Sequence, residues 1–201
     1  LIQLLEKAAH APHPLTILAL KAVQEAVVAG DHAVLGNAAL VPGELGDPEV
    51  ALLRRVLYAK AAGRSNTVSR DEAELLFEIN DTLENTCGEW RDFFAEGMVA
   101  HLIEQASPRG YIGEAEAQWF CDRVMLDGKL KGETEIETLI QLLEKAIYAP
   151  EPLGILALEA VQDAVLNGDH EVLGNAALVP GELGDPEVAL LRRVLYAKGA
   201  G

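Results

Sequence analysis

The sequence has few basic residues, with 16 Lys and Arg against 32 Asp and Glu, and its formal net charge is −16. A field of this sign repels the phosphate backbone of nucleic acids and the surface of an anionic membrane. We therefore expect neither of these as a partner. A divalent cation or a basic protein is compatible with the charge, although solubility alone also explains it.

Long apolar runs and cysteines are scarce as well. The stretch from Pro14 to Leu20 is among the longest apolar runs and falls far short of the roughly 20 residues that cross a membrane. We therefore expect no membrane insertion. The two cysteines, Cys87 and Cys121, lack the spacing of metal ligands, so we expect reduced, packed thiols and a cytoplasmic protein. No signal segment is visible, and we expect the chain to begin inside a repeat.

Signatures of catalysis are missing from the sequence. We find no nucleophile beside a plausible base, no glycine-rich phosphate loop and no zinc-ligand spacing. The sequence therefore predicts no enzymatic activity and no cofactor other than a divalent cation such as calcium. Alternation of apolar and polar residues with period two is also absent, which predicts an all-α fold without a sheet.

The most prominent feature present is a duplication. Residues 1–63 recur as residues 139–201 with ten differences, nine of which lie in the first 33 positions of the copy. Residues 34–60 are identical to residues 172–198. We attribute such an identical block primarily to recent copying of the unit, and only secondarily to functional constraint. Internal repetition of this kind predicts a tandem array of helical units.

Apolar residues spaced by three and four, together with helix start and stop signals, predict a series of helices along the chain. Asp47, Pro48 and Glu49 predict a helix start with Asp47 as its cap, and Ser69 with Glu72 forms a capping box. The expected helices cover residues 1–9, 15–29, 47–60, 70–83, 89–105, 114–127 and 133–148.

The glycine- and proline-containing connectors divide the chain into blocks of about six helices. Each connector also carries residues that are too apolar to be left in water, so we expect connectors to dock neighbouring blocks. The predicted domains are the end of a preceding block (1–30), a connector (31–46), a complete block (47–168, with halves 47–106 and 113–168), a second connector (169–185) and the first helix of the next block (186–201). The predicted docking residues are Leu35, Leu40, Val41, Leu45, Leu173, Leu178, Val179 and Leu183.

A helix that ends in Asp127 and Gly128, followed by Lys129, Leu130 and an acidic helix start, resembles the TerB-like family of helical domains associated with tellurite resistance. The similarity is best over residues 118–146 and weaker over residues 53–83, where Gly63 to Asn66 replace the Asp-Gly pair. Residues 53–59 and 70–81 also resemble uncharacterised bacterial tandem-repeat helical proteins, which implies no activity. The TerB-like resemblance implies a divalent-cation-binding or stress-response module with three ligands: Asp127, Glu133 and Glu135.

Each candidate site has a plainer alternative. Asp127, Glu133 and Glu135 also fit a helix stop followed by an acidic helix start, which the capping rules favour. His32 and His170, at matched connector positions, form either a metal pair or ordinary turn contacts. A cation site or a solvated helix face explains the acidic cluster of Asp71, Glu72, Glu74, Glu78, Asp81 and Glu84.

Two hypotheses of function follow. The first is a structural or interaction module of a long array, a scaffold, rod or fibre whose partners are neighbouring repeat blocks of the same protein or further copies of it. The alternative is the TerB-like cation-binding module.

Overall fold

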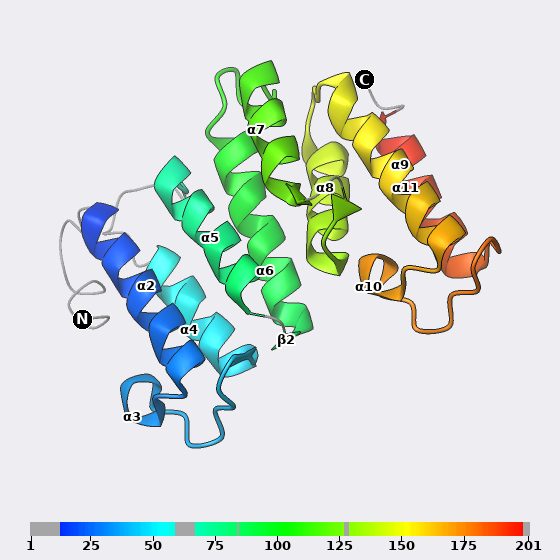
Figure 1. Cartoon of the computed structure of the whole chain (residues 1–201). Coiled ribbons are helices and arrows are strands. Elements are labelled where there is room, and N and C mark those ends of the chain that lie inside the picture. The colour runs from blue at the N-terminus through cyan, green and yellow to red at the C-terminus, as the bar shows by residue number, and fades with distance from the viewer. Residues whose placement is uncertain (1–12, 59–66, 84, 127–128, 199–201) are drawn as a thin grey trace. The chain divides into compact units, whose positions relative to one another are not determined.

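The computed structural model describes residues 13–58, 67–83, 85–126 and 129–198 (Figure 1). Helices make up 70% of the chain, which confirms the all-α class. The chain divides into two compact units, Leu1–His101 and Leu102–Gly201. The division falls inside the π-helix η1 (Ala100–Glu104), and each unit is described by itself.

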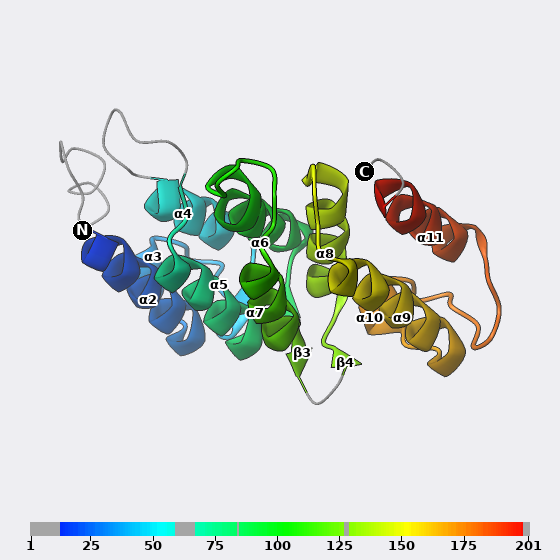
Figure 2. The ribbon, with the colours of Figure 1, turned by 90° about the horizontal axis from the view of Figure 1, so that it is seen from above.

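In the part of unit 1 that the structure describes, four long helices lie in two rows, an arrangement that Figure 2 shows from above. One row holds α2 (His13–Ala29) and α5 (Arg70–Thr82), and the other holds α4 (Asp47–Tyr58) and α6 (Gly88–Val99). Helix α2 packs on both α4 and α5, and α6 closes the arrangement against α4 and α5. The centre is aromatic, since Phe77 and Phe94 meet edge to face at 5.0 Å and the Trp90 indole donates to Asn80 Oδ1 at 2.9 Å.

Unit 2 contains α7 (Glu114–Val124), α8 (Glu133–Lys145), α9 (Glu151–Asn167) and α11 (Asp185–Lys198). Helix α11 packs on α8 and α9, and α9 also packs on α7. Helices α9 and α11 carry the duplicated sequence of α2 and α4. Between each such pair lies a one-turn helix, α3 (His32–Leu35) in unit 1 and α10 (His170–Leu173) in unit 2, in a stretch predicted to be a connector.

The expectation of no sheet is wrong in detail, because two pairs of very short strands are present. Strand β1 (Glu44–Leu45) pairs in parallel with β2 (Asn85–Thr86), and β3 (Met125–Leu126) pairs antiparallel with β4 (Lys129–Leu130). Two residues are too few to produce a visible alternation pattern. The Asp-Gly pair between β3 and β4 is nevertheless a strong hairpin signal, and the prediction of a helix boundary there did not include a hairpin.

Helices α4 and α5 start with the same device, a glutamate at the third helical position that folds back on the preceding backbone. Glu49 Oε2 accepts from the Gly46 N–H at 3.2 Å, and Glu72 Oε2 accepts from the Ser69 N–H at 2.8 Å. The capping box of Ser69 and Glu72 is therefore confirmed. Asp47 is not the cap of α4, because it lies inside the first turn and Glu49 satisfies the orphan amide.

Candidate docking surfaces

In unit 1, the flank of α4 that faces α6 is covered by aromatic and charged contacts. Arg54 forms an ion pair with Glu96, and its guanidinium carbon lies 5.1 Å from the centre of the Phe93 ring. One turn further along α4, the Tyr58 ring meets Phe93 edge to face at 6.2 Å. Phe93 itself is fully buried. This flank of α4 therefore belongs to the core of unit 1.

The backbone continues the same interface at the start of α4. Strand β1 pairs with β2 in the register Glu44 to Asn85 and Leu45 to Thr86. The N–H of Cys87, just before α6, donates to the carbonyl of Leu45 at 3.1 Å. The segment before α4 and the segment before α6 are thus joined by main-chain hydrogen bonds, which do not depend on side-chain identity.

In unit 2, the identical sequence has a different environment. Residues 172–198 repeat residues 34–60 without change, but three side chains that are buried in the first copy are open to solvent in the second. The exposed fractions rise from 2% at Leu45 to 59% at Leu183, from 1% at Val50 to 37% at Val188, and from 0% at Leu57 to 56% at Leu195. Tyr196 and Arg192, the equivalents of Tyr58 and Arg54, are exposed too. We call the set Leu183, Val188, Arg192, Leu195 and Tyr196 the α11 face.

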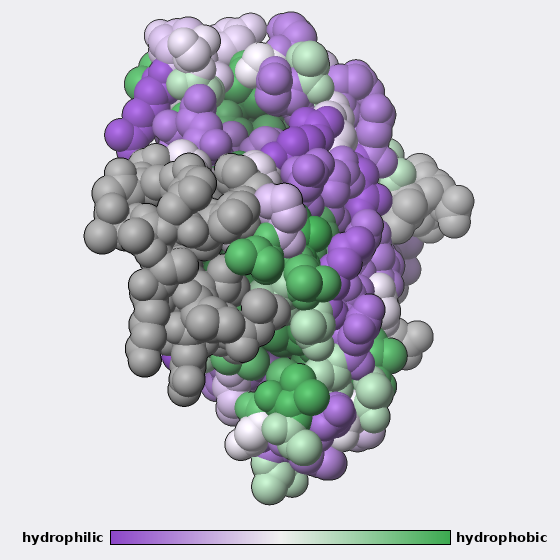
Figure 3. All heavy atoms as spheres, turned by 90° about the vertical axis from the view of Figure 1, so that its left-hand side faces the viewer, coloured by the Kyte–Doolittle hydropathy of each residue, from purple (hydrophilic) through white to green (hydrophobic). Residues whose placement is uncertain are grey.

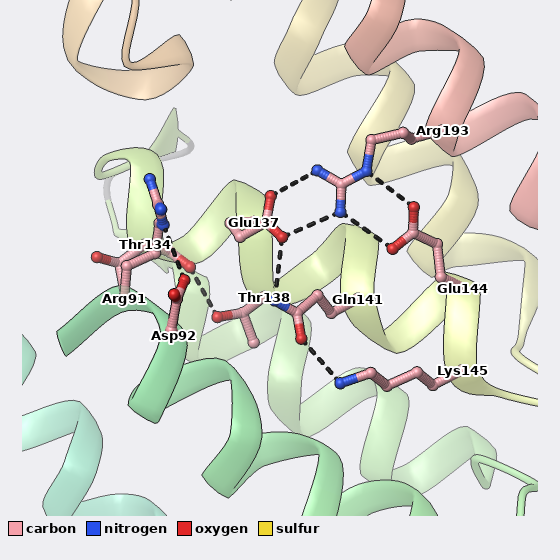
Figure 4. Close-up of polar contacts among 9 residues, drawn as sticks. All are labelled: Arg91, Asp92, Thr134, Glu137, Thr138, Gln141, Glu144, Lys145 and Arg193. Carbon is pink, nitrogen blue, oxygen red and sulfur yellow. Dashed lines mark hydrogen bonds and ion pairs between the residues drawn. The ribbon is translucent and has the colours of Figure 1, made fainter. Parts of the chain in front are cut away.

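The opposite flank of α11 is held by a charged cluster with α8 (Figure 4). Arg193 donates to the two carboxylate oxygens of Glu137 at 2.7 and 3.0 Å and to those of Glu144 at 2.8 and 3.0 Å. The hydrogen bonds to Glu144 and then to Glu137 raise the pKa of the Arg193 guanidinium above its usual range. Such paired, planar contacts are geometrically specific. They fix the rotation of α11 about its axis and thereby which side chains form the α11 face.

A second open surface lies on α2 and α3 in unit 1. Leu15, Leu18 and Val34 are exposed there, whereas their equivalents Leu153, Leu156 and Val172 are buried in unit 2. Figure 3 shows apolar side chains gathered on this face of unit 1 between hydrophilic ones. In unit 2, Leu156 and Val172 line a shallow pocket with Met125 and Leu130 of the β3–β4 hairpin, so this hairpin lies against the corresponding surface.

The connectors pack on their own units. Leu40 and Leu178 are buried, and the N–H of Gly43 donates to the carbonyl of Val27 at 3.0 Å. Leu35 and Leu173 are partly buried. Val41 and Val179 are half exposed, Leu45 is buried at the β1–β2 pair, and Leu183 is exposed. Of the eight predicted docking residues, the structure thus brings Leu45 and Leu183 into the surface that differs between the copies.

Each connector is closed by the same polar contacts in both copies. Asn175 Nδ2 donates to Glu187 Oε1 at 2.6 Å, and the Gly184 N–H donates to Glu187 Oε2 at 2.9 Å. Asn37 and Glu49 repeat the first contact at 2.6 Å. The Asn175 hydrogen bond, followed by the backbone amides, lowers the pKa of Glu187. The end of the connector is therefore fixed before α11 begins, which holds Leu183 in a defined position.

The predicted cation ligands are only partly described. Asp127 lies outside the described residues, and Glu135 is buried at the start of α8. Glu133 lies against Gly174, where an added Cβ would come within 2.7 Å of both carboxylate oxygens. Among the described residues, no group of three or more His, Cys, Asp and Glu side chains is arranged to hold a metal ion. A site that includes Asp127 stays a prediction.

The remaining candidates make local contacts. The Nδ1 atoms of His32 and His170 lie 2.9 and 3.0 Å from the carbonyls of Asn37 and Asn175, as expected for turn histidines. In the acidic cluster, Glu72 caps α5, while Glu84 lies outside the described residues. Both cysteines are free thiols, and burial is the main cause that raises the pKa of each. A raised pKa disfavours the reactive thiolate.

Searches of protein-family models, curated proteins and solved structures find no match to this chain. Within the described residues, no helix is long and apolar enough to cross a membrane.

Proposed function

We propose that the chain is a structural module of a helical repeat array, in which successive units of 138 residues stack to form a scaffold, rod or fibre. The observation that carries this proposal is the contrast between α4 and α11. One sequence is buried by the helices that follow it in unit 1, and the same sequence leaves an apolar flank open in unit 2. An enzyme needs one site, whereas an array needs many equal interfaces.

The physical basis is that of repeat proteins in general. A single helical repeat cannot bury both of its flanks, so each repeat is completed by its neighbours and stability accumulates along the array. The open flanks on α2 and α11 fit this rule, because each is closed in the other copy by residues that lie between the two copies in sequence.

The test compares chains built from one, two and three consecutive copies of residues 1–138. We expect the maximum dimension in small-angle scattering to rise by a constant increment per unit, and the melting temperature to rise with the number of units. A matched series with Phe93→Ser in every unit removes the ring that α4 packs on. A melting temperature that does not depend on the number of units, together with scattering that shows units without fixed contacts, would contradict the array.

The alternative function, a TerB-like divalent-cation-binding or stress-response module, stays a prediction centred on Asp127, Glu133 and Glu135. It is checked by a thermal melt in chelator and in millimolar calcium at fixed ionic strength, so that screening of the −16 charge is not mistaken for binding. A rise in melting temperature that Asp127→Asn abolishes would support it.

A further inference from the structure

We infer that the α11 face is a docking surface for one kind of partner, a helical segment with the chemistry of β2 and α6 supplied by a further repeat unit. This inference rests on the proposed array and names the occupant of one of its interfaces. Leu183, Val188, Leu195 and Tyr196 present an apolar strip, and Arg192 lies among them as an exposed cation.

The identity of the occupant follows from the first copy, in which the same surface is covered. Leu45, Val50 and Leu57 are buried there, at the interface with β2 and α6. Residues 172–198 are identical to residues 34–60, so a segment that fits the first surface also fits the second. Three features define it: an extended dipeptide, an aromatic ring at the place of Phe93, and an acid at the place of Glu96.

Unit 2 contains the equivalents of the unit 1 residues that contact these three features. Glu182 and Leu183 lie outside any strand, as the counterparts of the β1 residues that pair with Asn85 and Thr86. Arg192 corresponds to Arg54, which binds Glu96 and lies over Phe93.

Helix α9 adds an independent contact for the same segment. In unit 1, Gln24 of α2 donates to Thr82 Oγ1 of α5 at 3.2 Å. The equivalent Gln162 of α9 is exposed, and so is Ile155, whose equivalent Ile17 is partly buried. A segment that follows the order of α5, β2 and α6 would cover α9 and α11 together, as α5 and α6 cover α2 and α4.

The direct experiment appends a copy of residues 64–104 after Gly201, which continues the repeat in its own register. Leu195→Cys then serves as the probe, with Cys87 and Cys121 and the cysteine of the appended segment replaced by alanine. We expect rapid maleimide labelling in the original chain and labelling at least tenfold slower in the extended chain, because the equivalent Leu57 is fully buried. A matched extension with Phe93→Ser and Glu96→Lys in the appended copy should restore rapid labelling. Equal labelling of the original and extended chains would overturn the inference.

A second measurement does not depend on the cysteine variants. Leu195→Asp should leave the melting temperature of the original chain unchanged within about 1 °C, since an exposed substitution has little effect. In the extended chain the same substitution should lower it by about 5 °C or more, as expected for a charge placed in a buried interface of a domain of this size. An equal effect in both chains would contradict the inference.

Sedimentation of the original chain distinguishes the occupants. A monomer with a freely labelled residue 195 is expected. A dimer that Leu195→Asp dissociates would mean that a second copy of the chain covers the α11 face, and it would overturn the assignment to a β2–α6 segment. The two proposals can fail separately. Slow labelling of residue 195 in the extended chain, without stacking of the 138-residue units, would refute the array alone. Stacking of the units with rapid labelling of residue 195 would refute this docking surface alone.

Discussion

The guanidinium carbon of Arg54 lies 5.1 Å from the centre of the Phe93 ring, while the Arg54 side chain also reaches Glu96. One residue of α4 thus contacts both an aromatic ring and a carboxylate of α6. Its sequence equivalent in unit 2, Arg192, is exposed. The pair of arginines provides an internal comparison in which the local sequence is constant and only the surroundings differ.

Arg54→Met should lower the free energy of unfolding by about 1 kcal/mol, because it removes a cation–π contact and a partly exposed ion pair. Arg192→Met is the control and should change it by less than about 0.5 kcal/mol. Urea denaturation measures both. A loss at Arg192 as large as that at Arg54 would show that α11 already has a partner equivalent to α6.

Leu57→Ala and Leu195→Ala make the same chemical change in the same local sequence. Leu57 is fully buried, so its truncation should cost about 2–5 kcal/mol through lost burial and a residual cavity. Leu195 is more than half exposed, and its truncation should cost less than about 0.5 kcal/mol. Denaturation midpoints of the two variants give the comparison, and similar losses would contradict the description of the α11 face.

Arg193→Lys should lower the free energy of unfolding by about 1 kcal/mol, because an ammonium cannot reproduce the paired contacts to both Glu137 and Glu144. The cluster is about one third exposed, so solvent reduces its strength. The difference between wild type and variant should therefore shrink in about 0.5 M salt. Arg192→Lys is the matched control. A salt-independent loss at Arg193 would indicate a packing effect.

The lowered pKa of Glu187 predicts a dependence of stability on pH. In the folded state this carboxylate stays ionised at pH values where the unfolded chain, with a pKa of about 4.3, already binds a proton. Its contribution is therefore fully present above about pH 5 and is lost as the pH falls through the folded pKa. Glu187→Gln should flatten the decrease in melting temperature between about pH 5 and 3. An unchanged pH profile would exclude Glu187 as a contributor.

Gly168→Ala and Gly181→Ala separate backbone strain from steric overlap. Both glycines have positive φ, +69° and +79°, which costs a residue with a Cβ about 1–2 kcal/mol. A Cβ on Gly168 would also lie 2.5 Å from Cγ of Pro180, whereas one on Gly181 would meet nothing within 4 Å. Gly168→Ala should therefore be the more destabilising by about 1–3 kcal/mol. Equal thermal shifts would mean that the contact of Pro180 relaxes freely.

The helices were predictable because their signals are local. The capping box of Ser69 and Glu72 and the glycine stop at Gly168 lie within a few residues of the helix ends that they set. The short strands and the one-turn helices were missed, since two to four residues carry no periodicity. Only the Asp-Gly pair before Lys129 indicated the β3–β4 hairpin, and it was assigned to a helix boundary.

The candidate docking surface was predictable only in part. The apolar connector residues predict docking between neighbouring blocks, and they differ in burial: Leu40 and Leu178 are buried, whereas Val41 and Val179 are half exposed. The burial of Leu40 and Leu178, however, is against their own unit. The residues that differ most between the copies lie on α11, in a helix whose sequence looks like an ordinary amphipathic segment.

Residues 34–60 and 172–198 have the same sequence, so a comparison of the two shows which properties the sequence determines and which the tertiary structure determines. The sequence by itself determined the contact of asparagine with glutamate and the helix that follows, because hydrogen bonds between near neighbours form wherever that sequence occurs. Only the tertiary structure decided that Leu57 is buried and Leu195 is open to water. Burial is a property of the surrounding helices: α6 packs on one flank of α4, whereas α8 and α9 hold α11 and leave Leu195 exposed.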